Sequence, residues 1–430
     1  MIMTMIRPET EMKDSGVQWL GNIPKEWSVG KVKHEFYATK TIVGDKVNDY
    51  ERLALTLNGV IKRSKDADDG LQPEKFDGYQ ILKEHELVFK LIDLVNVSTS
   101  RVGLSPYTGI VSPAYIVLHH RKDMNPRYSE YYFLSMWMNE VFNHIGGDGV
   151  RSALNAKDLL NIPYLKVSYD EQQAIADYLD KTCSKIDEII AEAKASIDEY
   201  KELKQSVIFE TVTTGLDKNV EMKDSTLEFI SSIPLNWKVC RIATIYEESK
   251  ETGREDLPIL MVSINTGISE YEVGDDQRIR KVTRSDDKSI YKVVHRNDLV
   301  YNMMRAWQGG FGAAQVDGLV SPAYVVATPK SDVDSRYIEA LLRTPIFTEK
   351  IHGLSYGVAD FRLRLYWTYF KELRICLPPI DEQREIANYI ANESKKIDRL
   401  IKEKTVLIND LEAYKKSLIY EVVTGKRRVV

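Results

Sequence analysis

The chain of 430 residues contains an internal repeat with a period of about 210 residues. MKDS at 12–15 returns at 222–225, VSPAY at 111–115 returns at 320–324, and DEQQAIADYL at 170–179 returns as DEQREIANYI at 381–390. The blocks keep their order and lie at offsets between 209 and 211, which chance does not produce. Since an internal period decides the architecture before any local propensity does, we interpret the chain as a tandem duplication.

Each copy begins with a segment rich in predicted strands. Residues 1–169 and 222–380 contain runs such as LVFKLIDLV, IVSPAYIVL and LVSPAYVVA, which are punctuated by Gly, Pro, Asn and Asp. Both segments also contain one amphipathic helix candidate, near 128–144 and near 336–351. We therefore predict two mixed α/β domains in tandem.

Each copy ends with a predicted long helix, in 170–221 and in 381–430. From Ile175 to Val207, including Ile186 and Ile189, apolar residues step mostly by four and three, the seam of a coiled coil. The same positions recur in 381–418, where Ile397 and Leu400 belong to the seam. The stripe could instead pack on the neighbouring domain, but roughly 40 residues without Gly or Pro extend about 60 Å, more than such a domain needs.

The overall prediction is an α+β fold with a pseudo-twofold internal repeat. Two helices of equal length are expected to pair as an antiparallel coiled coil, with one domain at each end.

Composition narrows the function without deciding it. The net charge of -5 does not exclude a nucleic-acid partner, because 170–221 carries 6 Lys+Arg against 13 Asp+Glu while 12–169 carries 20 against 19. Three cysteines, Cys183, Cys240 and Cys376, form no CxxC pair, so neither a disulfide framework nor a zinc site is expected. No apolar run reaches the roughly 20 residues of a membrane span and no signal peptide is recognisable, so we expect a cytoplasmic protein.

The segments of the chain that resemble catalytic motifs are incomplete. Asn125-Pro126-Arg127-Tyr128 resembles the Asn/Asp-Pro-Pro-Tyr motif of amino-methyltransferases, but Arg127 replaces the second proline and no convincing S-adenosylmethionine loop follows a strand. GGDG at 146–149 and GGFG at 309–312 lack the Lys-Ser/Thr of a phosphate-binding loop and indicate turns with positive φ. We expect no catalysis and no metal site in this chain.

Taken together, the duplicated blocks resemble the specificity subunits of type I restriction–modification systems over essentially the whole chain. The residues that carry the resemblance are the Ile-Pro-x-x-Trp segments at 23–27 and 233–237, DLVYNMMRAWQGGFG at 298–312, both VSPAY segments, and LPPIDEQREIANYI at 377–390.

The resemblance implies two target-recognition domains, at 1–169 and 222–380, each reading one half of a split asymmetric site in double-stranded DNA. The helices at 170–221 and 381–430 would set the spacer between the half-sites. The chain itself would bind no cofactor. Two modification (methyltransferase) subunits, which use S-adenosylmethionine, would dock beside the domains, and restriction subunits that use ATP and Mg²⁺ would join them.

The two domains differ in their loops. Copy one has KLIDLVNVSTSRVG at 90–103 where copy two has NMMRAWQGGFG at 302–312, so we expect them to read different half-sites. Arg pairs with guanine and Asn or Gln with adenine, which makes Asn302, Arg305, Trp307 and Gln308 candidates for base readout. The alternative is that Trp307 packs in the core and Arg305 forms an internal salt bridge.

Further DNA contacts are expected from basic side chains. The candidates are Lys62, Arg63, Lys65, Lys90 and Arg101 in copy one, the dense run Arg278, Arg280, Lys281 and Arg284 in copy two, and the aligned pair Arg151 and Arg362. For Arg151 and Arg362 we favour phosphate contacts, whereas the run at 278–284 could also be a solvated loop. Two other functions remain open, a fused restriction or methylation enzyme and a coiled-coil scaffold whose domains bind protein.

Overall fold

A computed structural model describes residues 4–66, 75–92, 94, 101–121, 124–145, 153–254, 256–264, 267–269, 288–357 and 363–429. It divides into two compact units, Met1–Lys194 with Val406–Val430, and Ala195–Thr405. Each unit therefore contains one strand-rich domain together with part of each long helix. The two units are described in turn.

The domain of the first unit is built from short strands, with helices at its end. Its strands are β1 (Thr4–Ile6), β2 (Met12–Asp14), β3 (Asn22–Pro24), β4 (Ser28–Lys31), β5 (Phe36–Ala38), β6 (Arg52–Thr56), β7 (Gly59–Arg63), β8 (Gln80–Leu82), β9 (Leu87–Phe89), β10 (Val102–Leu104), β11 (Gly109–Val111), β12 (Ile116–His120) and β13 (Pro163–Lys166). Its helices are α1 (Val32–Glu35), α2 (Pro126–Met138), α3 (Val141–Ile145) and α4 (Ala156–Asn161), and α5 (Tyr169–Thr214) follows.

The second unit repeats this order. Its strands are β14 (Met222–Leu227), β15 (Ile230–Pro234), β16 (Lys238–Arg241), β17 (Tyr246–Ser249), β18 (Met261–Ser263), β19 (Gly267–Ser269), β20 (Lys292–Val294), β21 (Leu299–Asn302), β22 (Phe311–Ala313), β23 (Gly318–Val320), β24 (Tyr324–Pro329) and β25 (Arg374–Leu377). Its helices are α6 (Ile242–Ile245), α7 (Ser335–Leu342), α8 (Pro345–Gly353) and α9 (Trp367–Phe370), and α10 (Ile380–Val423) and β26 (Arg427–Val429) end the chain.

The duplication is confirmed by the sheets. A four-stranded sheet in the order β10-β9-β12-β5 has its counterpart in β22-β21-β24-β17, and the pairs β13-β4 and β2-β3 correspond to β25-β16 and β14-β15. β1 pairs with β26, so the first and last described segments of the chain lie in one small sheet of the first unit. The predicted mixture of strands and helices in both copies is thus present.

Two local predictions were wrong. Each copy has two helices where one was expected: Glu140 adopts a φ of 59° between α2 and α3, and Pro345 cannot continue α7 and begins α8 instead. The VSPAY segments are not strands throughout. Strands β11 and β23 end at their valines, and a turn that contains the proline leads into β12 and β24, with the amide of Tyr115 donating to the Ser112 carbonyl.

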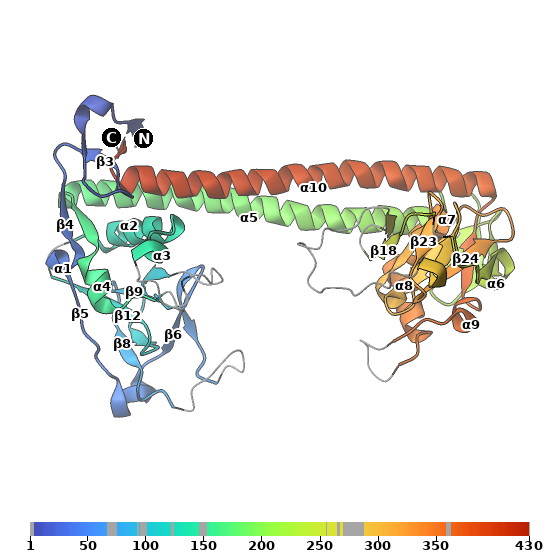
Figure 1. The fold of residues 1–430 in the computed structure, drawn as a ribbon, viewed down its shortest axis with the longest axis horizontal. Helices are drawn as coiled ribbons and strands as arrows, with labels where there is room; N and C mark the ends of the chain where they lie inside the picture. The colour runs from blue at the N-terminus through green and yellow to red at the C-terminus, as the bar shows by residue number, and fades with distance from the viewer. Residues whose placement is uncertain are drawn as a thin grey trace. The chain divides into compact units, whose positions relative to one another are not determined.

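The long helices were predicted correctly and pack together as an antiparallel pair within each unit (Figure 1). In the first unit Lys415 of α10 binds Asp187 of α5 at 2.6 Å, and in the second unit Lys204 of α5 binds Asp398 of α10 at 2.7 Å. The two pairs join equivalent positions of the two copies at an offset of 211. The duplicated sequence therefore makes the same interhelical ion pair twice.

The seam between the helices departs from its prediction at single positions and not along its whole length. Ile186 and Ile397 are buried, at 5% and 6% exposure, as expected. Ile189, however, is 44% exposed, and its neighbour Ile190 is buried in its place. Because both residues are isoleucine, the apolar periodicity alone cannot distinguish them, and the packing against α10 selects Ile190.

The Ile-Pro-x-x-Trp segments attach each domain to its long helix. The buried Trp27 donates from Nε1 to Glu171 at the start of α5 at 2.9 Å, and Trp237 donates to Glu382 at the start of α10 at 3.0 Å. The domain also holds the end of the other helix, because Tyr337 donates to the carbonyl of Val212 in α5 at 3.1 Å. In the first unit Tyr128 donates to the carbonyl of Val423 in α10 at 3.5 Å, so each domain is bound to both helices of its unit.

Both long helices end at a glycine that the packing requires. Gly215 and Gly425 follow α5 and α10 with φ of +79° and +73°, the left-handed conformation that favours glycine after a helix. A Cβ at Gly425 would lie 2.4 Å from Pro24 and 2.9 Å from Trp27. The repeated Thr-Gly dipeptides are therefore helix stops pressed against the Ile-Pro-x-x-Trp segments.

Within the described part of the chain, neither long helix nor any other has the length and apolar character that a bilayer span requires.

Candidate nucleic-acid interface

The four candidates for base readout in the second unit lie at the end of β21, which is Asn302, and in the loop that leads from it to β22. A 3-10 turn, η5 (Ala306–Gln308), interrupts this loop, and Gly309 follows with a φ of 85°, as expected for GGFG. The amides of Gln308 and Gly310 both donate to the Arg305 carbonyl, and a Cβ at Gly310 would lie 2.8 Å from that oxygen. The backbone of this loop is therefore closely specified by its own hydrogen bonds.

Arg305 and Gln308 form a pair at the surface of this loop. Arg305 is exposed and donates from its guanidinium to Oε1 of Gln308 at 2.8 Å. The bond holds the two side chains side by side, and the amide NH₂ of Gln308 remains a donor chemically distinct from the guanidinium. The pair places hydrogen-bond donors of two kinds at the surface of the loop.

Asn302 and Trp307 contribute to the loop itself. Asn302 accepts at Oδ1 from the amide of Met304 at 3.0 Å, which closes the first turn after β21. Trp307 donates from Nε1 to the Met304 carbonyl at 3.1 Å. Its ring packs against the core of the second unit, and the centroids of the Trp307 and His352 rings are 5.3 Å apart. The alternative of a core-packed tryptophan therefore describes Trp307 better than an open stacking surface does.

The basic candidates of the first unit are in unlike environments. Lys62 is exposed on β7 with its ammonium 5.1 Å from the ring of Tyr107, while Lys65 donates to the Val47 carbonyl at 2.7 Å. Arg63 and Lys90 are partly exposed. Arg101 differs from the expectation of a surface cation, because its side chain is 1% exposed. Burial of that kind suits a structural role within the domain.

The remaining basic candidates lie outside the described residues. These are Arg151, the run Arg278, Arg280, Lys281 and Arg284, and Arg362. They stay predictions from the sequence.

The segment that resembles a methyltransferase motif caps a helix. Asn125 is buried, and its side chain accepts from the amide of Tyr128 at 2.9 Å, while Pro126 occupies the first turn of α2. Arg127 donates to Asp180 of α5 at 2.6 Å. Since the Asn125 carboxamide is engaged inside the domain, it is not presented to a substrate amino group.

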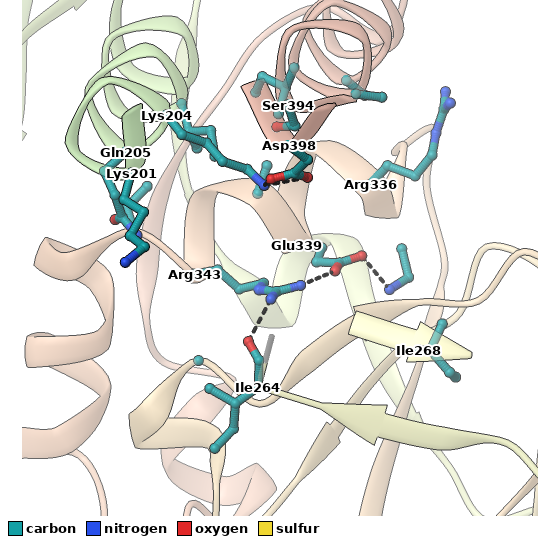
Figure 2. Close-up of a pocket in the computed structure, with 18 of the residues that line it drawn as sticks. Lys201, Lys204, Gln205, Ile264, Ile268, Arg336, Glu339, Arg343, Ser394 and Asp398 are labelled. Carbon is teal, nitrogen blue, oxygen red and sulfur yellow. Dashed lines mark hydrogen bonds and ion pairs between the residues drawn. The ribbon is translucent and has the colours of Figure 1, made fainter. Parts of the chain in front are cut away.

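Sequence reasoning missed the polar residues around a groove beside Gln308 in the second unit. There Arg343 binds Glu339 at 2.7 Å and donates to the carbonyl of Ile264, and Lys204 binds Asp398 (Figure 2). Burial raises the pKa of Glu339, although Arg343 and the amide of Ala313 act to lower it. The spacing of Glu339 and Arg343, four residues apart on a helix, is the signal that could have indicated this pair.

Among the residues that the structure describes, no group of three or more His, Cys, Asp or Glu side chains is placed to hold a metal ion.

The chain is similar to a known protein over nearly the whole length of both chains. The chain is 22% identical over 438 aligned positions to the type I restriction enzyme MjaX specificity subunit of Methanocaldococcus jannaschii, covering 95% of this chain and 96% of that protein. No protein-family model matches the chain.

Two solved structures share the fold. A chain from a structure concerned with complex assembly and conformational transition of the type I R-M system superposes with a TM-score of 0.68 at 12% identity, covering 94% of this chain and 99% of that one. The HsdS subunit from Thermoanaerobacter tengcongensis gives a TM-score of 0.51 at 12% identity, covering 94% and 98%. The similarity thus includes both copies and both long helices.

Proposed function

Since this chain is a homologue of the type I restriction enzyme specificity subunits, as its sequence predicted, we propose that it is the DNA sequence-recognition subunit of such a system. It carries out no catalysis and binds no cofactor of its own, in keeping with that family. The observation that carries the proposal is the full-length match of a duplicated chain to a specificity subunit of nearly the same extent.

We further propose that each domain reads one half of a bipartite, asymmetric site in double-stranded DNA. The two domains share the order of their main sheets but differ in the loop after the central strand, where the second unit presents Arg305 and Gln308. Domains with an equivalent main sheet and different loops are what two different half-sites require, because base edges are distinguished by side-chain donors and acceptors.

The partners follow from the same proposal. Two modification subunits would bind S-adenosylmethionine and supply the methyl transfer, and restriction subunits would use ATP and Mg²⁺. Lys62, Arg63, Lys65 and Lys90, together with Arg151, Arg278, Arg280, Lys281, Arg284 and Arg362, would supply phosphate or base contacts. The complex would act in the cytoplasm, where the bacterial or archaeal chromosome lies.

The readout proposal is tested by Arg305→Ala in the assembled complex. Loss of a bidentate base contact costs about 1–3 kcal/mol and relaxes preference at one position of the site. Sequencing of the sites methylated by the variant complex should show one degenerate base in one half-site. Arg241→Ala removes an exposed arginine of the same unit that is paired to Glu372, and should leave the site unchanged. Equal weakening of all sequences by Arg305→Ala would instead indicate a phosphate contact or a structural role.

We also propose that α5 and α10 set the gap between the half-sites. Insertion of one heptad into α5 adds about 10 Å of helix at 1.5 Å per residue and preserves the apolar seam. That length corresponds to roughly three base pairs, although duplex twist over the added step could reduce the tolerated change. Methylation mapping should show the same half-site bases with a longer gap. An unchanged gap at full activity would refute this role of the helices.

A further inference from the structure

The second unit contains a groove of about 870 Å³ between α7, the β18–β19 hairpin and the two long helices. Its walls combine apolar side chains, among them Ile208, Ile390 and Ile401, with the polar groups Gln205 and Gln308. Figure 2 shows the Lys204–Asp398 pair on one side and Arg343, between Glu339 and Ile264, on the other. A volume of this size is within the range of pockets that bind small molecules or side chains.

The internal repeat shows what occupies the equivalent place in the first unit. Arg127, Glu130 and Tyr131 of α2 correspond to Arg336, Glu339 and Ala340 of α7 at an offset of 209. The correspondence is structural as well, because Glu130 accepts from the amide of Leu104 of β10 just as Glu339 accepts from Ala313 of β22.

In the first unit the side chain of Tyr131 fills the position that corresponds to the groove. Its side chain is 4% exposed, its hydroxyl donates to Asp180 of α5 at 2.8 Å, and the Arg127 guanidinium lies 4.8 Å from its ring centroid. Arg127 itself binds Asp180 at 2.6 Å. Tyr131, Arg127 and Asp180 thus form one packed cluster between α2 and α5.

The second unit keeps the arginine and loses the other two groups. Ala340 replaces Tyr131, and Ala391 replaces Asp180, and both alanines line the groove. Arg336 is directed to Asp334 and Asn388 instead. The groove therefore includes the place that a phenol ring and a carboxylate fill in the first unit.

We propose that this groove receives an aromatic side chain, tyrosine by preference, from the modification subunit that docks at the second unit. The inference rests on the proposed function, since it requires that partner. The isoleucines and alanines would contact the ring, Arg336 at the rim could lie over its face as Arg127 does over Tyr131, and Gln205, Ser394 or Asp398 could accept from the hydroxyl.

A neutral side chain suits the groove better than a DNA phosphate. Its cations already have carboxylate partners: Lys204 binds Asp398, Arg343 binds Glu339, and Arg336 binds Asp334. A phosphate would have to compete with these carboxylates, whereas a phenol needs one acceptor and an apolar surface. The second unit would then engage its modification subunit through a contact that the first unit replaces with its own Tyr131.

The first test uses p-cresol, the side-chain analogue of tyrosine, on the full chain. NMR titration should show saturable binding to the wild-type chain and at least tenfold weaker binding to Ala340→Tyr, which fills the groove from within. Toluene, which lacks the hydroxyl, should bind more weakly than p-cresol. Equal binding of p-cresol to wild type and Ala340→Tyr would overturn the proposal.

The second test measures assembly with the purified modification subunit. Ala340→Tyr should weaken its association at the second unit at least tenfold, while Ala340→Ser, which leaves the groove open, should not. The double variant Ala340→Tyr/Ala391→Asp rebuilds the arrangement of the first unit and guards against misfolding of the single variant. Unchanged assembly in the double variant would overturn the inference, as would weakening of DNA binding alone, which would assign the groove to nucleic acid. If the wild-type chain recruits no modification subunit, the proposed function itself fails.

Discussion

The seam of the coiled coil allows a prediction with a built-in control. Ile186 and Ile189 lie three residues apart on α5, both in the first unit, and both were expected to face α10 from the sequence. The structure separates them, because Ile186 is 5% exposed and Ile189 is 44% exposed. Substitution of each by aspartate changes the same side chain in the same helix and differs only in burial.

The magnitudes follow from that difference. Removing a buried isoleucine forfeits about 1.5–3 kcal/mol of apolar burial, and an unpaired carboxylate in an apolar contact raises the total to about 3–5 kcal/mol. At the exposed Ile189 the cost should stay within about 1 kcal/mol. The lower helix propensity of aspartate, roughly 0.5 kcal/mol, applies to both and cancels in the comparison. Both positions also have an acidic neighbour, Asp187 and Glu188.

Chemical denaturation followed by circular dichroism measures the free energy of unfolding of each variant. Ile186→Asp should remove a large part of the roughly 5–15 kcal/mol that stabilises an ordinary domain, whereas Ile189→Asp should unfold close to the wild type. Equal losses at the two positions would show that the helices do not pair in the phase described, and a larger loss at Ile189 would restore the seam expected from periodicity alone.

Two further predictions concern charged pairs. Asp398→Lys places two lysines together in the second unit and should lower the free energy of unfolding by up to about 1 kcal/mol. The added change Lys204→Asp should restore most of that loss in a double-mutant cycle measured by urea denaturation. No restoration would show that this partly exposed pair does not fix the register of the helices. The second prediction concerns the ion pair of His119 and Glu86. The hydrogen bond with Glu86 raises the pKa of His119, although burial acts to lower it. Burial acts to raise the pKa of Glu86, but His119 and the Lys83 amide outweigh it, so that the pKa of Glu86 is lowered. The Glu86 contribution is present above its ordinary pKa of 4.5 and is lost as pH falls through the lowered value, while the His119 contribution is present below 6.5 and is lost as pH rises through the raised value. The stability difference between wild type and His119→Gln should therefore be largest between these pH values and shrink in alkaline solution, and a difference independent of pH would argue against the ion pair.

Much of the candidate interface lay beyond the reach of sequence patterns. The loop after β21 was located correctly because it follows a strongly apolar strand and carries the residue types that read bases. Its inner organisation was not predictable, since whether Trp307 packs inward or Arg305 bonds to Gln308 depends on side chains from α8 and on the turn at Gly309. Arg101 illustrates the same limit, because a cation chosen for its charge is buried in the folded domain.

The duplication, the two mixed domains, the two long helices and the resemblance to type I specificity subunits could all be read from the sequence, because repeated blocks and the helical period are properties of the chain taken in order. Three features became visible only in the folded chain: which of two adjacent isoleucines enters the seam, where VSPAY turns, and why the second unit has a groove. For the seam and the groove the deciding contact joins residues far apart in the chain, whereas the turn in VSPAY is closed locally by the bond from the Tyr115 amide to the Ser112 carbonyl. Nothing in the sequence alone marks Ala340 and Ala391. They leave a space because α7 and α10 bring them together at the place where Tyr131 and Asp180 meet in the first unit.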